Sequence, residues 1–87
     1  MTNGKEETNA ATEQHLHAMM TAFALSRQEA RLTLGLVSGL SLKVSAQTIG
    51  VRYETARGYL KSIFAKTDCN SQTALLLKTH RDLDIRL

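Results

Sequence analysis

The sequence predicts an all-α fold for one small domain of 87 residues. Proline, which removes a backbone donor and clashes with the preceding helical turn, is absent. Alanine and leucine, which favour helices, are abundant, and several stretches place apolar residues three or four positions apart. Hydrophobic residues make up 43% of the chain, an ordinary value for a globular domain with one modest core.

The N-terminal region divides into a tail and a helix. Residues 1–10 are polar and show no periodic apolar pattern, so we expect a flexible tail there. Residues 11–24 place four apolar side chains at helical spacing, which predicts an amphipathic helix that packs on the domain or on a partner. These side chains are Leu16, Met19, Met20 and Phe23.

Local signals mark four further helices within residues 25–80, which we expect to form the folded domain. Ser26 and Glu29 have the spacing of a capping box, in which each side chain bonds the backbone N–H of the other residue. The capping box predicts a helix over residues 27–38, which Gly39 ends.

The other three helices are expected over residues 42–49, 53–66 and 72–80, followed by a C-terminal tail over residues 81–87. Ser41 and Ser71 supply N-terminal caps, and Gly50 ends the shortest helix. Asp68 and Asn70 are typical of the turn that precedes the last helix.

Two of these helices are joined by a three-residue turn, Gly50-Val51-Arg52, which is the shape of a helix-turn-helix. With about 100° between successive residues, the second helix has two unlike sides. Its apolar side carries Ala56, Leu60 and Ile63, with Tyr59 and Phe64 at the edges. Its opposite side carries Glu54, Arg57, Gly58 and Lys61.

The polar side of helix 53–66 has groups that suit a DNA groove. Arg57 and Lys61 lie one helical turn apart, and the arginine fork can bond O6 and N7 of guanine together. Gly58 lets the backbone approach a base edge, and Thr55 offers a hydroxyl and a backbone N–H to phosphate. The same pattern also fits an ordinary solvated helical face, so the residues alone leave both interpretations open.

The charge of the chain is unevenly placed. Up to Ala24 there are one lysine and three glutamates, whereas from Leu25 onward ten basic residues face five acidic ones. A basic body indicates an anionic partner, most often nucleic acid, although a solvated surface with a small cationic excess is the alternative.

Several classes of protein are disfavoured. The single cysteine, Cys69, cannot form a disulfide framework or a zinc cage alone, so no metal or cofactor is predicted and a reducing, cytoplasmic location is expected. No apolar run is long enough to span a bilayer. No nucleophile–base pair or phosphate-cradling glycine loop is present, which argues against an enzyme.

Spaced markers across residues 25–77 resemble the LuxR/GerE/FixJ-type helix-turn-helix domain of bacterial transcription regulators. The matching positions are Leu25, Ser26 and Glu29, then Gly39-Leu40-Ser41 and Lys43, Ala46, Ile49-Gly50-Val51, Thr55-Ala56, Ile63-Phe64, Lys66, and Ser71 with Leu75. The resemblance implies sequence-specific binding of double-stranded DNA, with helix 53–66 in the major groove. It also implies a homodimer, or a heterodimer with another regulator of this type.

The resemblance also implies roles for single residues. Arg57, Gly58 and Lys61 would face the bases, together with Glu54 on the same side. Thr55, Tyr59 and Lys43 would lie near phosphates, and we add the cations Arg52 and Lys66 to this group. The dimer interface would use the last helix through Leu75, Leu76, Leu77 and Thr79.

The sequence also departs from the family pattern. Thr33, Gly35 and Ser45 replace apolar residues, so we expect a thin core that the helix around Leu16 completes. Arg52 stands where a capping serine is usual, which removes a cap from helix 53–66.

A different function remains open on the sequence alone. The leucine-rich last helix and the helix of residues 11–24 could bind another regulator and modulate it without DNA. DNA binding is the preferred hypothesis because Arg57, Lys61 and Thr55 keep chemistry that suits a groove.

Overall fold

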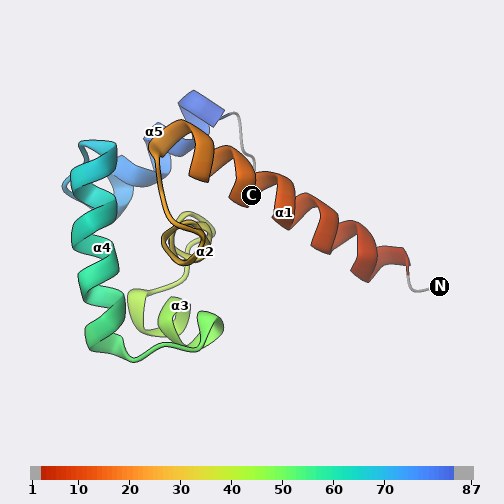
Figure 1. Ribbon diagram of the computed structural model, residues 1–87, viewed down its shortest axis with the longest axis horizontal. Helices are drawn as coiled ribbons and strands as arrows, with labels where there is room; N and C mark the ends of the chain where they lie inside the picture. Colours follow the sequence, from red (N-terminus) through yellow and green to blue (C-terminus); the bar gives the residue numbers. More distant parts are fainter. Residues whose placement is uncertain (1–2, 84–87) are drawn as a thin grey trace.

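The structure, a computed structural model, describes the backbone of residues 3–83 and the side chains of residues 12–83. This part of the chain is all-helical (Figure 1). Its elements are α1 (Asn3–Phe23), α2 (Arg27–Val37), α3 (Leu42–Ile49), α4 (Tyr53–Thr67) and α5 (Gln72–Leu83). Helix α2 lies at the centre, α4 forms one edge, and the N-terminal half of α1 extends away from the other helices (Figure 1).

Two terminal helices are longer than the sequence predicts. Helix α1 begins at Asn3, so the expected tail of residues 1–10 is helical over residues 3–10, while residues 1–2 lie outside the described part. Half of this segment (Lys5, Glu6, Glu7 and Ala10) consists of residues that favour helices, it contains no proline, and a helix does not require an apolar stripe throughout its length. Helix α5 likewise continues to Leu83, and only residues 84–87 of the expected C-terminal tail lie outside the description.

The local signals at the helix ends are confirmed. The Ser26 N–H donates to Glu29 Oε1 at 2.8 Å, and the Glu29 N–H donates to Ser26 Oγ at 3.1 Å, which completes the capping box. The Ser41 hydroxyl accepts from the Val44 N–H, and the Ser71 hydroxyl accepts from the Ala74 N–H. Each hydroxyl satisfies a backbone donor that has no partner within its own helix.

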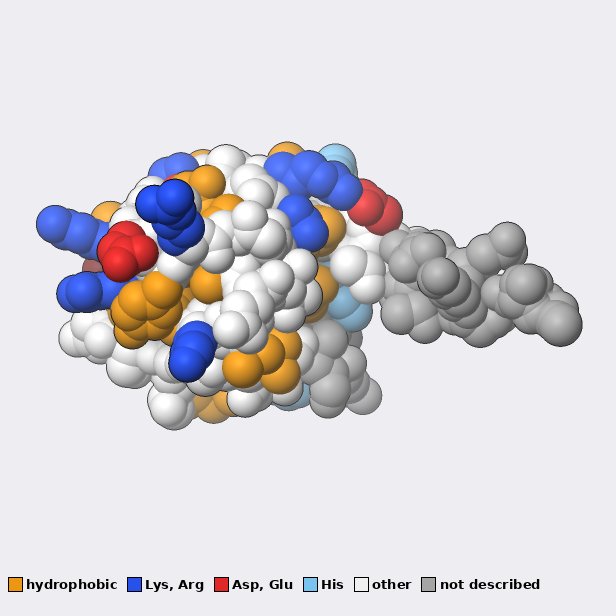
Figure 2. Space-filling model, turned by 90° about the horizontal axis from the view of Figure 1, so that it is seen from below, with side chains coloured by type: hydrophobic (Ala, Val, Ile, Leu, Met, Phe, Trp, Pro, Cys, Tyr) orange, Lys and Arg blue, Asp and Glu red, His pale blue; other side chains and the backbone are white. Residues whose placement is uncertain are grey.

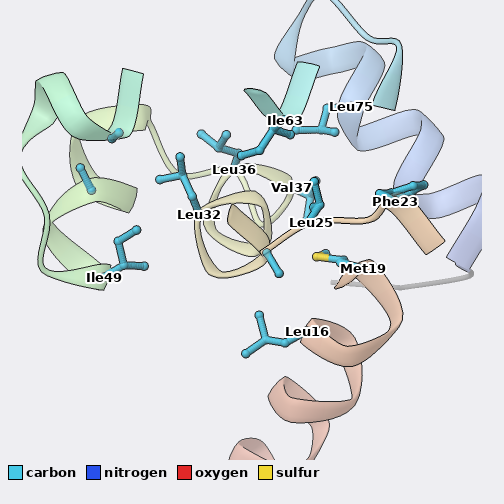
Figure 3. Packing of buried hydrophobic residues seen from close by; sticks show 13 residues of the cluster. Leu16, Met19, Phe23, Leu25, Leu32, Leu36, Val37, Ile49, Ile63 and Leu75 are labelled. Carbon is cyan, nitrogen blue, oxygen red and sulfur yellow. The ribbon is translucent and has the colours of Figure 1, made fainter. Parts of the chain in front are cut away.

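The core is built around α2 and closed by α1, α3, α4 and α5 (Figure 3). Leu32 and Leu36 of α2 are fully buried, as are Ile63 of α4 and Leu75 of α5. Helix α1 supplies Leu16, Met19 and Phe23, all buried. The expectation that α1 completes a thin core is therefore confirmed.

Gly35 and Ser45, two small residues at positions where the family has apolar ones, pack against each other where α2 meets α3. A Cβ atom at Gly35 would lie 2.6 Å from Ser45 Oγ and 3.0 Å from Ser45 Cβ, too close for either to stay in place. The absence of a side chain at Gly35 thus lets α3 approach α2 with a serine in between. The packing of these two helices requires the glycine.

Candidate nucleic-acid interface

Helices α3 and α4 are joined by the predicted three-residue turn, residues 50–52. Gly50 has φ 78° and ψ 32°, a left-handed conformation that glycine adopts without steric cost. The N–H of Val51 donates to Ala46 O at 3.0 Å, which ties the turn to the end of α3. Arg52 occupies the N-cap of α4 with no side-chain cap hydrogen bond, so its guanidinium is not used to begin the helix.

Helix α4 separates its residues as its sequence predicts. Ala56 and Ile63 are fully buried, and Tyr59, Leu60 and Phe64 pack partly against the core. Its exposed residues include Glu54, Thr55, Arg57, Gly58 and Lys61. The proposed base-contacting residues therefore share one open surface, whereas Tyr59 is half-buried at its margin.

Four cations at this side of the molecule, Lys43, Arg52, Arg57 and Lys61, are exposed, and we call them the basic edge. None of the ion pairs found among residues 12–83 involves them. Figure 2, which views the molecule from below, shows Lys and Arg side chains gathered at the edge where α4 lies. Between residues 42 and 61 the four cations face a single acidic side chain, Glu54. This segment alone thus carries an excess of three positive charges, the formal net charge of the whole chain.

The environment of Gly58 differs from that of a structural glycine. A Cβ atom built there would meet nothing within 4 Å, and Gly58 lies inside α4 rather than at its end. A glycine in a helix interior costs about 0.5–1 kcal/mol relative to alanine. No contact within residues 12–83 requires a glycine at this position.

Sequence reasoning missed two exposed apolar side chains beside the basic edge. Val44 on α3 is 42% exposed, and Tyr53 at the start of α4 is 48% exposed. A methyl group suits the C5-methyl of thymine, and a tyrosine offers a ring together with a hydroxyl. The sequence did contain a signal for Val44. The helical period of α3 places Val44 on the side opposite the core residue Ala46, where an apolar side chain is exposed.

The structure corrects the role of Lys66. Its ammonium nitrogen lies 2.8 Å from Glu29 Oε1, and the Glu29 side chain is only 8% exposed. Burial acts to raise the pKa of this carboxylate, but hydrogen bonds from Lys66, Ser62 and the Ser26 backbone outweigh it and lower the pKa to about 2. Lys66 therefore joins α4 to α2 and is not a free cation for phosphate.

The proposed dimer residues fall into two groups. Leu75 and Thr79 are 0% and 1% exposed within the chain itself, so they cannot contact a partner and that part of the prediction is wrong. Leu76 and Leu77 are 41% and 60% exposed. The helical period explains the division, since positions 75 and 79 share the core-facing side of α5.

The described part of the chain provides no metal site and no membrane-spanning helix. No cluster of three or more histidine, cysteine, aspartate or glutamate side chains that could hold a metal occurs among the described residues. Cys69 is partly buried, and its thiol lies 3.6 Å from Thr67 O. No helix within residues 3–83 combines the length and apolar character needed to cross a bilayer.

Comparisons with protein-family models, with characterised proteins and with solved structures gave no match for this chain. Its function therefore has to be argued from its own residues.

Proposed function

We propose that this protein is a sequence-specific DNA-binding transcription regulator of the LuxR/GerE/FixJ helix-turn-helix type. The single observation that carries the proposal is the basic edge, four exposed cations on α3, the turn and α4 that form no ion pair. Exposed cations that have no ion-pair partner among the described residues, on and beside a helix at the edge of the fold (Figure 1), suit the phosphates and base edges of duplex DNA. As proposed, the protein acts on DNA in the bacterial cytoplasm.

In this proposal α4 enters the major groove with its exposed side. Arg57 and Lys61 bond to base edges, and Gly58 allows the helix backbone close to them. Glu54, one turn before Gly58, accepts from a cytosine amino group. These contacts determine which DNA sequence the protein prefers.

Other residues of the same surface hold the protein in register on the phosphates. Lys43 and Arg52 supply charge, and Thr55 supplies a hydroxyl and a backbone N–H at the start of α4. Tyr59 contributes through its hydroxyl from the margin of the surface, because its ring packs partly on the core. Lys43→Ala should therefore weaken binding to all sequences alike, whereas Arg57→Ala should relax the sequence preference.

We further propose that the protein binds DNA as a homodimer through Leu76 and Leu77. These are exposed leucines in adjacent positions of α5, and burying them in an interface removes apolar surface from water. Leu77→Glu should convert the dimer to monomers in sedimentation equilibrium, with Gln47→Glu, an exposed residue of α3 that adds the same charge, as a control. An unchanged molecular mass of the Leu77→Glu variant in solution would show that Leu77 is not in the interface. Sedimentation of the protein mixed with another regulator of this type would test for a heterodimer.

Selection of bound sequences from random duplex DNA tests the proposed function. A base-reading protein enriches one motif, and its affinity for that motif falls steeply with salt because bound cations release counterions from the phosphates. The absence of enrichment at low salt would contradict the proposal and favour the alternative, a module that binds and modulates another regulator without DNA.

A further inference from the structure

A cavity of about 290 Å³ lies between α1, α2 and α3, away from the exposed side of α4. Its walls are mainly apolar and include Leu16, Leu34, Gly35 and Ile49, with Arg31 and Ser45 among them. Exposed Leu40 and Thr48 also line it, so the cavity meets solvent. A volume near 300 Å³ is at the lower end of the range found for small-molecule sites.

Ser45 gives this cavity a polar group that the fold leaves unused. The residue is 1% exposed, and its hydroxyl oxygen has no hydrogen-bond partner. This oxygen faces Gly35, which lines the same cavity. A buried hydroxyl without a partner is unfavourable, and a bound acceptor would remove this cost.

Arg31 supplies a cation to the same cavity. Its Nη1 donates to Gln28 Oε1 at 2.7 Å, which holds the half-buried side chain in place. Only this one of the five guanidinium donors has a hydrogen-bond partner among the described residues. No carboxylate in this part of the chain lies within ion-pair distance of Arg31, and Glu13 interacts with its charge from farther away. The free donors suit the two oxygens of a carboxylate, which arginine binds in a fork.

We propose that this cavity binds a small monocarboxylic acid with an apolar body. The carboxylate accepts hydrogen bonds from Arg31, and the apolar body packs against Leu16, Leu34 and Ile49. The Ser45 hydroxyl donates to an oxygen of the same carboxylate. This site does not depend on DNA binding, so either proposal can fail without the other.

The direct test titrates the ¹⁵N-labelled protein with octanoate and, as an uncharged match, with octanol at pH 7. We expect octanoate to shift amide resonances around residues 31–35 and 45–49 and to bind at least tenfold more tightly than octanol. The Arg31→Gln variant should lose this preference, because it keeps a polar side chain but removes the cation. Arg27→Gln, one turn earlier on α2 and outside the cavity, should keep it.

A second variant tests the cavity independently of charge. Thr48 is an exposed residue of the cavity wall, so Thr48→Phe should fill the space without disturbing the core and should abolish the binding of both probes. The proposal is overturned if octanoate causes no shifts at millimolar concentration, if its shifts lie elsewhere, or if Arg31→Gln binds it as well as the wild type.

Discussion

The cations of the basic edge differ in their ion-pair partners from those of the rest of the described chain, which we call the body. In the body, Arg27 pairs with Glu13, and Lys78 and Arg81 both contact Asp82. Arg31 is the exception among the described body cations, because its guanidinium bonds to Gln28 and to no carboxylate. Lys66, at the end of α4, pairs with the buried Glu29. Along the basic edge the described part of the chain offers no carboxylate within ion-pair distance of any cation. Internal charge compensation thus stops where α4 faces solvent.

Two glycines show the same division. Gly35 in the body is required, because a Cβ atom there would overlap Ser45 Oγ. Gly58 on the exposed side of α4 has open space where its Cβ would be. The fold explains the first glycine and not the second. Gly58 and the cations of the basic edge, which form no ion pair among the described residues, are thus features of this surface that the fold itself does not explain.

The largest effect should come from neutralising the two central cations of the basic edge. We expect Arg57→Gln combined with Lys61→Gln to weaken binding to a selected DNA site on the order of 100-fold, because each contact to a base edge discriminates by about 1–3 kcal/mol. Fluorescence anisotropy at fixed salt measures this change. The matched control is Arg27→Gln in the body, and an equal loss there would show that only overall charge matters.

The ion pair between Lys66 and the buried Glu29 should contribute most to the stability of the body and to its pH dependence. Glu29→Gln should lower the free energy of unfolding by about 2 kcal/mol at pH 7, since it removes a charged acceptor from Lys66 and Ser62. Because folding lowers the Glu29 pKa from 4.5 to about 2, its contribution is complete above pH 4.5 and is lost as the pH falls toward 2. Urea unfolding at several pH values measures both effects.

The control for this pair is Glu54→Gln on the exposed side of α4. Glu54 has no ion-pair partner among the described residues, so its substitution should change stability by less than about 0.5 kcal/mol. If Glu29→Gln and Glu54→Gln changed the free energy of unfolding by the same small amount at every pH, the ion pair between Glu29 and Lys66 would not contribute to stability as described.

The two glycines should respond in opposite directions to the same substitution. Gly58→Ala should stabilise the protein by about 0.5–1 kcal/mol through helix propensity and yet weaken DNA binding, because its methyl group occupies the open surface. Gly35→Ala should destabilise by about 1 kcal/mol through the contact with Ser45. Thermal unfolding gives the stabilities. A Gly58→Ala variant with unchanged affinity would remove Gly58 from the interface.

The smallest effect concerns the connection between α1 and α2. Ala24 has φ 57°, a left-handed conformation that is unfavourable for a residue with a Cβ atom. Ala24→Gly should therefore raise the free energy of unfolding by about 0.5–1 kcal/mol and leave DNA affinity unchanged. Urea unfolding and anisotropy together check it, and a loss of stability would indicate that the strain is relieved in some other way.

Local features of the fold could be predicted from the sequence because they depend on neighbouring residues. The capping box of Ser26 and Glu29, the left-handed Gly50 and the two sides of α4 all follow from spacing over one or two helical turns. The exposed residues of the candidate site were predictable for the same reason, since periodicity separates Arg57 and Lys61 from Ile63.

Features that depend on distant residues could not be predicted in this way. Lys66 and Glu29 are 37 positions apart, and only the packing of α4 on α2 brings them together. Leu75 and Leu77 look alike in sequence, and the position of the core decides that one is buried and the other exposed. The cavity beside Ser45 likewise requires the relative placement of three helices.

The most direct test of the account maps the DNA contact onto the folded chain. The ¹⁵N-labelled protein would be titrated with a selected DNA duplex at low salt, and amide shifts would be followed residue by residue. The account predicts that the perturbed amides cluster at residues 43–61 and fade as salt is raised. Perturbations centred on α1 or α5, with α4 unchanged, would contradict it.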